Sequence, residues 1–227
     1  FEDANLAYNV NGVYEFDSGF DQSAFELAYW DLMVRHESLR TVFRANDQGD
    51  IRQLILDPDS DKFQVSYFDF QDRNEADESS QKISEYITEA FDLYNGPLFK
   101  AGLFRLSPER LVLAYSMHHI ISDGWSLQVM MRELLVLYHA HVSGTASGLL
   151  PLRIQYKDYV MWQIMENSTS HYDEMKAYWL GEFSGDLPVL NLAGDYPRPV
   201  VKSYKGSTYH THFDKTVTAG LHRLSKS

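Results

Sequence analysis

Two adjacent histidines, His118 and His119, stand at the end of an apolar run and shortly before Asp123-Gly124. Histidine is the side chain best suited to moving a proton near neutral pH, so this pair is the first candidate for chemistry. Residues 111–117 are apolar at both alternating sets of positions, which predicts a central strand covered on both faces. Neighbouring strand side chains point to opposite faces, so the two histidines cannot share one pocket. We therefore expect one chemical and one structural histidine.

The residues after the histidines predict a polar turn into a helix. Asp123 is of a type that caps helices, and the helix is expected to begin near Gly124 or Trp125. An apolar stripe at helical spacing continues over residues 127–141. A strand end, a turn and a helix start are thus predicted within about a dozen residues.

The rest of the chain mixes strand and helix patterns, which predicts a mixed α/β (α+β) fold. Expected strands cover residues 9–16, 41–45, 51–56, 63–70, 98–106, 110–117 and 207–213, with 41–45 and 51–56 forming a hairpin. Expected helices run from a cap at Asp21 or Ser23 to about His36, through Ile83 to Phe91, and over 127–141, 154–162 and 170–183, and a last one begins at Thr216.

Composition narrows the possible functions. The 227 residues are 44% hydrophobic, enough for a substantial core, and the net charge of -12 argues against a nucleic-acid partner. The absence of cysteine excludes disulfides and a cysteine nucleophile and fits a cytoplasmic protein. No apolar run approaches the roughly 18 to 20 residues needed to span a membrane. His210 and His212 would share one strand face, but no third ligand at suitable spacing is identifiable, so we expect no metal site.

Several motifs together resemble one family. His118-His119-x-x-x-Asp123-Gly124, followed by Trp-Ser, closely resembles the active-site signature of nonribosomal peptide synthetase condensation domains, which the wider chloramphenicol-acetyltransferase-like acyltransferases share. Supporting matches are Arg-His-Glu-x-Leu-Arg-Thr-x-Phe at 35–43, Phe-Asp-Leu and Gly-Pro-Leu within 91–98, Tyr-x-Asp-Tyr-x-x-Trp at 156–162, and a proline-rich stretch at 187–199. The resemblance runs from about Tyr8 to Gly206.

This resemblance implies a chloramphenicol-acetyltransferase-like lobe, half of a V-shaped two-lobe pseudo-dimer. Residues 1–206 would form the N-terminal lobe of a condensation domain, and 207–227 would start the connection into a C-terminal lobe. The earliest core motif and the later motifs of the second lobe are missing, so the sequence looks excised from a longer one. Whether this chain is active alone stays open.

The resemblance also implies the chemistry. An acceptor amine would attack an aminoacyl or peptidyl thioester to form an amide, with an L-configured donor. His119 would orient the amine and accept its proton, His118 would be structural, and the Gly124 N–H would help to stabilise the oxyanion. Asp123 would shape the loop through an ion pair with Arg35 or Arg40 of the second motif, and a capping role at the helix start is compatible with this, so both roles stay open.

Further residues would support the substrate channel. These are Trp125, Ser126, Tyr156 and Trp162. The aromatic side chains among them are expected mainly to pack, and Trp125 is expected to be an anchor rather than a substrate contact.

The resemblance further implies the partners. Substrates would arrive on the phosphopantetheine arms of upstream and downstream carrier protein domains, an adenylation domain would belong to the same assembly line, and the domain itself would bind no cofactor.

Three alternatives stay open. Epimerisation domains keep both histidines but commonly place Ser before Trp after Asp-Gly, whereas this chain has Gly124-Trp125-Ser126. A docking platform would use the fold without catalysis, although such relatives tend to lose the second histidine or the Asp-Gly pair. A stand-alone acyltransferase would instead use coenzyme A. Heterocyclisation domains replace the histidines with aspartates, so His118-His119 argues against that branch.

Overall fold

The structure of this protein is a computed structural model. The structure describes residues 7–16, 19–59, 61–71, 76–197, 200–201, 209 and 211–226. The chain divides into two compact units, Phe1–Leu192 and Ala193–Ser227, which are described separately. The boundary expected at residue 206 lies outside the described residues.

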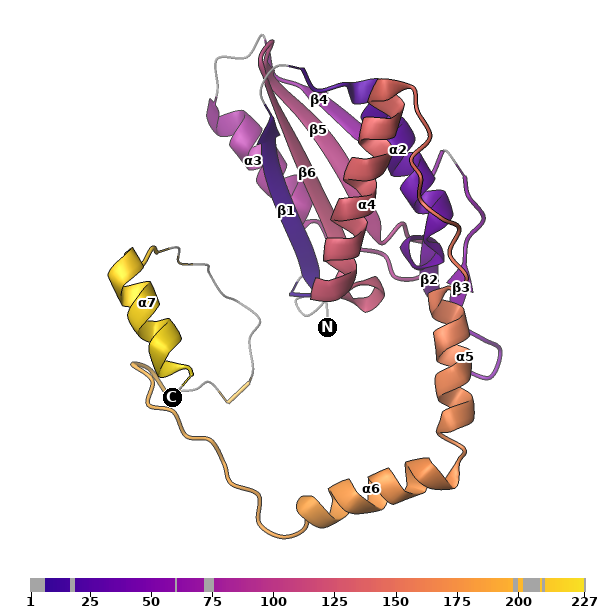
Figure 1. Ribbon diagram of the computed structural model, residues 1–227, viewed down its shortest axis with the longest axis vertical. Coiled ribbons are helices and arrows are strands. Elements are labelled where there is room, and N and C mark those ends of the chain that lie inside the picture. The colour runs from indigo at the N-terminus through magenta and orange to yellow at the C-terminus, as the bar shows by residue number, and fades with distance from the viewer. Residues whose placement is uncertain are drawn as a thin grey trace. The chain divides into compact units, whose positions relative to one another are not determined.

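The first unit is built on a four-stranded sheet in the order β1-β6-β5-β4 (Figure 1). Its strands are β1 (Asn9–Phe16), β6 (Arg110–His118), β5 (Phe99–Ser107) and β4 (Ser66–Asp69). β6 pairs antiparallel with both β1 and β5, and β4 runs parallel to β5. All residues of β6 from Leu111 to His118 are buried, which confirms the predicted central strand. The strand expected at 63–70 is shorter, because only its second half pairs with β5.

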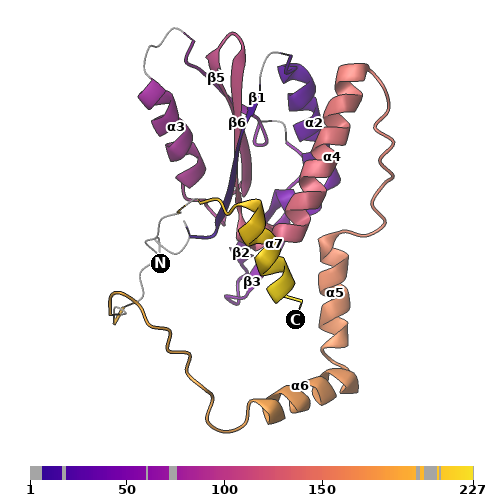
Figure 2. The same ribbon diagram turned by 60° about the vertical axis from the view of Figure 1, so that its left-hand side comes forward.

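Helices cover both faces of this sheet (Figure 2). α2 (Gln22–Arg35) and α4 (Gly124–Ser143) pack side by side on one face, and α3 (Ala76–Thr88) lies on the other. Alternate residues of β6 join different cores, since strand side chains alternate between faces. Leu113, Tyr115 and Met117 enter the core under α2 and α4, whereas Val112 and Ala114 enter the smaller core under α3.

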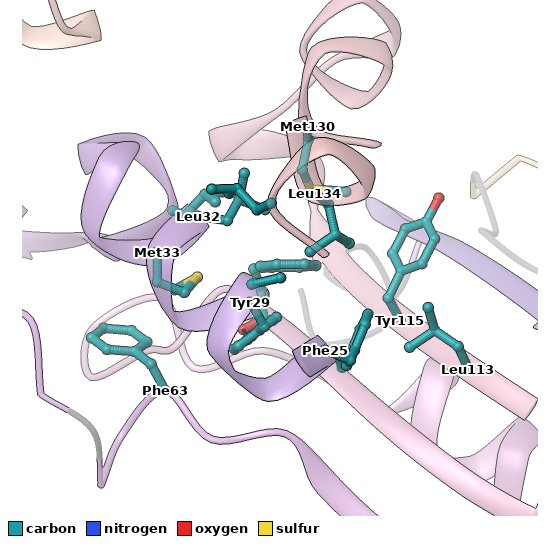
Figure 3. Packing of buried hydrophobic residues seen from close by; sticks show 14 of the residues in the cluster. Phe25, Tyr29, Leu32, Met33, Phe63, Leu113, Tyr115, Met130 and Leu134 are labelled. Atoms are coloured by element: carbon teal, nitrogen blue, oxygen red, sulfur yellow. Dashed lines mark hydrogen bonds between the residues drawn. The ribbon is translucent and has the colours of Figure 1, made fainter. Parts of the chain in front are cut away.

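The larger core explains why α2 and α4 form where they do. Apolar side chains at helical spacing on α2 meet apolar side chains of α4 and the sheet (Figure 3). The set includes Phe25, Tyr29, Leu32 and Met33 of α2 and Met130, Leu134 and Leu137 of α4. Asp21 caps α2 by accepting a hydrogen bond from the Ala24 N–H, which settles the choice between Asp21 and Ser23. The stripe predicted over 127–141 is therefore confirmed as a core-facing helix surface.

A short hairpin lies beyond the end of α2. The 3₁₀ turn η1 (Glu37–Arg40) connects α2 to β2 (Thr41–Ala45), which pairs antiparallel with β3 (Ile51–Ile55) as predicted. Gly49 has φ +84°, a conformation that glycine adopts without strain, and it allows the tight connection.

The helices nearer the C-terminus have no buried residues. α5 (Tyr156–Glu166) and α6 (Ser170–Glu182) belong to the first unit, and α7 (Lys215–Leu224) belongs to the second. Of the strand expected at 207–213, residues 209 and 211–213 are not in a strand, and the rest lie outside the described residues. Across the described ranges, the structure contains no helix both long enough and apolar enough to cross a membrane.

Candidate active site at the end of the central strand

His118 is the last residue of β6, and its side chain is buried. It is 5% exposed, and its ring lies near those of Phe91 and Tyr8. Its Nδ1 accepts a hydrogen bond from the Ile120 N–H at 3.0 Å, which shapes the turn after the strand. Burial, followed by the charge of His119, lowers the pKa of His118 below its ordinary value. This placement fits the structural role expected for the first histidine.

His119 begins the 3₁₀ turn η2 (His119–Ile121), and its side chain is exposed. Its backbone N–H donates to the Tyr8 carbonyl, which continues the β1–β6 pairing past the end of the strand. The residue lines a pocket of about 460 Å³. The other side chains around this pocket come from η1 and the hairpin (Ser38, Thr41, Phe43, Gln53), from the turn and start of α4 (Ile120, Ile121, Ser122, Asp123, Trp125, Ser126) and from α5 (Tyr156).

Asp123 is the N-cap of α4 in a reciprocal capping box. Its carboxylate accepts from the Ser126 N–H at 2.7 Å, and the Ser126 hydroxyl accepts from the Asp123 N–H at 2.7 Å. These hydrogen bonds from Ser126 are the main reason that the pKa of Asp123 lies below its usual range, and His119 adds a smaller electrostatic contribution. Ser126, predicted as a supporting residue, thus fixes the turn.

The ion pair expected between Asp123 and Arg35 or Arg40 is not formed among the described residues, and this prediction is corrected. Arg40 is buried and donates to the carbonyls of Met33 and Leu56. It therefore joins the end of α2 to the end of β3. Its guanidinium thus supplies donors to backbone carbonyls near the ends of both elements.

Arg35 pairs with a residue that the sequence analysis missed. Its Nε lies 2.9 Å from Glu133 Oε2 on α4, and its Nη1 donates a hydrogen bond to the Leu150 carbonyl at 2.7 Å. His36 Nε2 lies 2.7 Å from the same carboxylate oxygen. Burial raises the pKa of Glu133, but hydrogen bonds from Arg35 and His36 outweigh this, and the net pKa lies below the ordinary value. A glutamate three residues after Met130 on a core-facing stripe was the available signal, because buried carboxylates need partners.

Gly124 is the first residue of α4. As the first helical residue, it has an N–H without an acceptor inside the helix. A Cβ at this position would meet no other atom of the described chain within 4 Å. A molecule can therefore approach this backbone closely, and the helix start favours developing negative charge.

The aromatic residues expected to pack are exposed instead. Trp125 is 79% exposed, and Tyr156 and Trp162 are each 56% exposed. Trp125 and Tyr156 line the His119 pocket, whereas Trp162 does not. The prediction of Trp125 as a packed anchor is therefore wrong for this chain. Its helical position places the ring over the pocket rather than over the core.

No group of three or more His, Asp or Glu side chains in the part of the chain that the structure describes could hold a metal ion. His210, one half of the pair considered above, lies outside the described residues.

The first unit thus has a sheet with helices on both faces and a histidine at the pocket end of its central strand, and comparisons with known proteins assign this arrangement to a family. The Condensation domain family model matches residues 1–227. The chain is 38% identical over 225 residues to tyrocidine synthase 3 of Brevibacillus parabrevis, covering 99% of this chain and 3% of that protein. It is 35% identical over 226 residues to gramicidin S synthase 2 of Aneurinibacillus migulanus, covering 99% and 5%. The chain belongs to the condensation-domain family.

Solved structures agree with this fold. The X-domain from teicoplanin biosynthesis superposes with a TM-score of 0.72 at 26% identity, over 87% of this chain and 45% of that one. The epimerization domain from the third module of tyrocidine synthetase B gives a TM-score of 0.72 at 21% identity, over 82% and 42%. The chain thus spans less than half of these structures and under a tenth of the two synthases.

Proposed function

We propose that this chain is the histidine-bearing lobe of a domain that forms amide bonds between two carrier-bound substrates. The observation that carries the proposal is the contrast between neighbouring histidines. The side chain of His118 is buried at the end of the central strand. The side chain of His119 is exposed and lines a pocket that the start of α4 also lines. Membership of the condensation-domain family supports assigning this pocket to acyl transfer.

In this reaction the nitrogen of an acceptor amine attacks the carbonyl carbon of a donor thioester. The carbonyl oxygen becomes an oxyanion, which then re-forms the carbonyl as the C–S bond breaks and the thiolate leaves. The proton lost by the amine ends on the thiolate, with His119 as its carrier. The Gly124 N–H, at the positive end of α4, is the donor available to the oxyanion.

His119 need not be a strong base for this role. An α-amino group has a pKa of about 7.7 to 8.0, so an appreciable fraction is neutral at pH 7 before it binds. The thioester is also already activated. Orientation of the amine and removal of its proton after attack are then the contributions of His119, together worth roughly 10² to 10⁴ in rate.

The proposal includes the partners expected for such a domain. Donor and acceptor would be tethered to the phosphopantetheine arms of upstream and downstream carrier domains, and an adenylation domain would load them. The domain itself would bind no cofactor, a C-terminal lobe would supply the opposite wall of the channel, and the reaction would take place in the cytoplasm.

The test is single-turnover amide formation by the full-length protein that carries this chain, with two loaded carrier proteins. His119→Ala should lower the rate by at least about 100-fold. His118→Ala is the neighbouring comparison and should lower the unfolding midpoint, because it removes a buried ring and the acceptor of the Ile120 N–H.

Two results would contradict the proposal. Near-normal amide formation by folded His119→Ala would remove the catalytic assignment of His119 and favour a domain that only positions the two substrates. Chiral analysis of the donor residue provides the second, since inversion of the donor α-carbon without amide formation would identify an epimerisation domain.

A further inference from the structure

A second, smaller pocket adjoins the His119 pocket. It has a volume of about 200 Å³. The two pockets share Ser38 of η1, Ile121 and Ser122 of the turn after β6, and Trp125 and Ser126 of α4. A group held in the smaller pocket is thus separated from the His119 pocket only by the width of these shared side chains.

The interior of the smaller pocket is apolar. Besides the shared residues, it is lined by Leu39, Met117, Val129, Met130 and His36. Met117 and Met130 are both almost completely buried, so the pocket reaches the edge of the main core. Unbranched, polarizable methionine side chains adapt to ligands of different shape.

Most of the polar lining groups are already engaged with the protein. His36 Nε2 contacts the Glu133 carboxylate, the Ser122 hydroxyl donates to the His118 carbonyl at 3.3 Å, and the Ser126 hydroxyl is used in the capping box. Ser38 is the exception, since its hydroxyl makes no hydrogen bond within the described residues, and it lies on the wall shared by both pockets. A charged ligand group would therefore find no free ionic partner among these lining residues, and burying it would be costly.

We infer that this pocket binds the aliphatic side chain of an aminoacyl substrate while its α-amino or thioester group lies in the His119 pocket. The inference rests on the function proposed above and adds a side-chain class to it. The volume is about six to seven times the ~30 Å³ that a water molecule occupies in the liquid, so a branched side chain of about four carbons fits inside it. A leucine-sized group fits this description and a charged one does not.

The test fills the pocket without touching the catalytic residues. Val129 lines the pocket from α4, and Val136 lies two helical turns further along the same helix, is also half-buried and does not line the pocket. Val129→Phe should therefore block the pocket, and Val136→Phe is the matched control for added volume on α4. Both are made in the full-length protein, and circular dichroism checks their folding.

The measured quantity is the ratio of kcat/KM for leucyl over alanyl substrates, varied first on the donor carrier and then on the acceptor carrier. Val129→Phe should lower this ratio at least about tenfold in one of the two arms, because discrimination by an apolar pocket depends on the extra methylene groups. Val136→Phe should leave both ratios unchanged. An unchanged ratio in both arms for Val129→Phe, or an equal fall in both variants, would overturn the inference.

A binding measurement separates this inference from the proposed function. N-acetyl-leucyl-pantetheine and N-acetyl-alanyl-pantetheine are titrated by calorimetry into the unmodified protein and into Val129→Phe. A preference for the leucyl compound that Val129→Phe abolishes supports the pocket even if no amide forms, in which case the proposed function fails alone. Amide formation without any leucyl preference overturns the pocket alone.

Discussion

At the residue scale, the end of β6 gives two chemically identical neighbours different environments. His118 closes the strand and uses Nδ1 to hold the turn, while His119 leaves the sheet and meets a pocket. β6 ends at His118 and the 3₁₀ turn η2 begins at His119, so the change of backbone direction between them separates the two side chains. Asp123 then ends the turn by capping α4, so its first structural task is local.

Substitution of Asp123 distinguishes a cap from a charge partner. Asp123→Ala in the 227-residue chain should lower the free energy of unfolding by about 1 kcal/mol, because the Ser126 N–H loses its acceptor. Asp123→Asn should lose less than Asp123→Ala, since asparagine keeps the cap and removes only the charge. Urea unfolding measures both. Equal losses in the two variants would mean that the carboxylate charge, rather than the cap, carries the stability.

The same residue should give a characteristic pH response. Hydrogen bonds from Ser126 hold the pKa of Asp123 below its unfolded value, so its charged form contributes stability above the unfolded pKa and loses it as pH falls through the folded pKa. Asp123→Asn, which does not titrate, should therefore approach the stability of the unmodified chain in the acid range. A gap between the two that widens on acidification would contradict this assignment.

At the element scale, the buried carboxylate of Glu133 joins α4 to the end of α2. Arg35 and His36 both contact it, and these contacts join residues 98 and 97 positions apart in the chain. α4 also carries Asp123 and Gly124 at its start, so the cluster fixes the helix that positions the site. His36 also lines the smaller pocket, so the same side chain contacts Glu133 and forms part of the wall of that pocket.

Removal of this charge should destabilise the fold. Glu133→Gln should lower the free energy of unfolding at pH 7 by about 2 to 3 kcal/mol, because it leaves the partly buried Arg35 guanidinium without its anion. The pKa of Glu133 is lowered in the folded state, so this difference is present above the unfolded pKa and should shrink as pH falls through the folded pKa. Urea unfolding between pH 7 and pH 3 measures it.

Glu174→Gln on α6 is the matched control for this experiment. Glu174 is exposed and has no ion-pair partner in the described part of the chain, so its substitution should change stability by less than about 0.5 kcal/mol. A loss for Glu133→Gln no larger than that of the control, or one that grows on acidification, would show that the cluster does not stabilise the α2–α4 pair.

At the scale of the whole molecule, the first unit has a buried apolar core and also many exposed large apolar side chains. Its sheet and the helices α2, α3 and α4 bury their apolar faces, whereas α5 and α6 expose Trp162, Tyr178 and Trp179 among other large side chains. So many exposed large apolar side chains on two consecutive helices are unusual for a protein that acts alone. The solved relatives are more than twice as long as the matched segment, which agrees with a partner lobe in the proposed domain.

Tryptophan quenching tests this interpretation. Trp125, Trp162 and Trp179 are each more than half exposed, so acrylamide should quench most of the tryptophan emission of the 227-residue chain. In the full-length protein, Trp162 and Trp179 should be protected, because the proposed second lobe would cover apolar surface. Single-tryptophan variants of both proteins measure this residue by residue. Equal quenching of Trp162 in the two proteins would contradict a covering lobe.

The amino-acid sequence by itself determined the local structure of this protein. Period-two and helical spacing of apolar residues placed β1, β6, α2 and α4, and short-range capping chemistry placed the starts of α2 and α4, because these features depend on neighbours a few residues away. The order of motifs around His118-His119 likewise sufficed to identify the family, which the comparisons confirmed.

Only the tertiary structure decided which distant groups meet. Arg35 could have paired with Asp123 or with Glu133, and the packing of α2 against α4 brings it to Glu133. The exposure of Trp125 and Tyr156 likewise depends on what lies above them in three dimensions and not on their helical spacing. Charge pairing and burial of aromatic side chains are set by contacts between elements far apart in sequence, and local periodicity carries no record of those contacts.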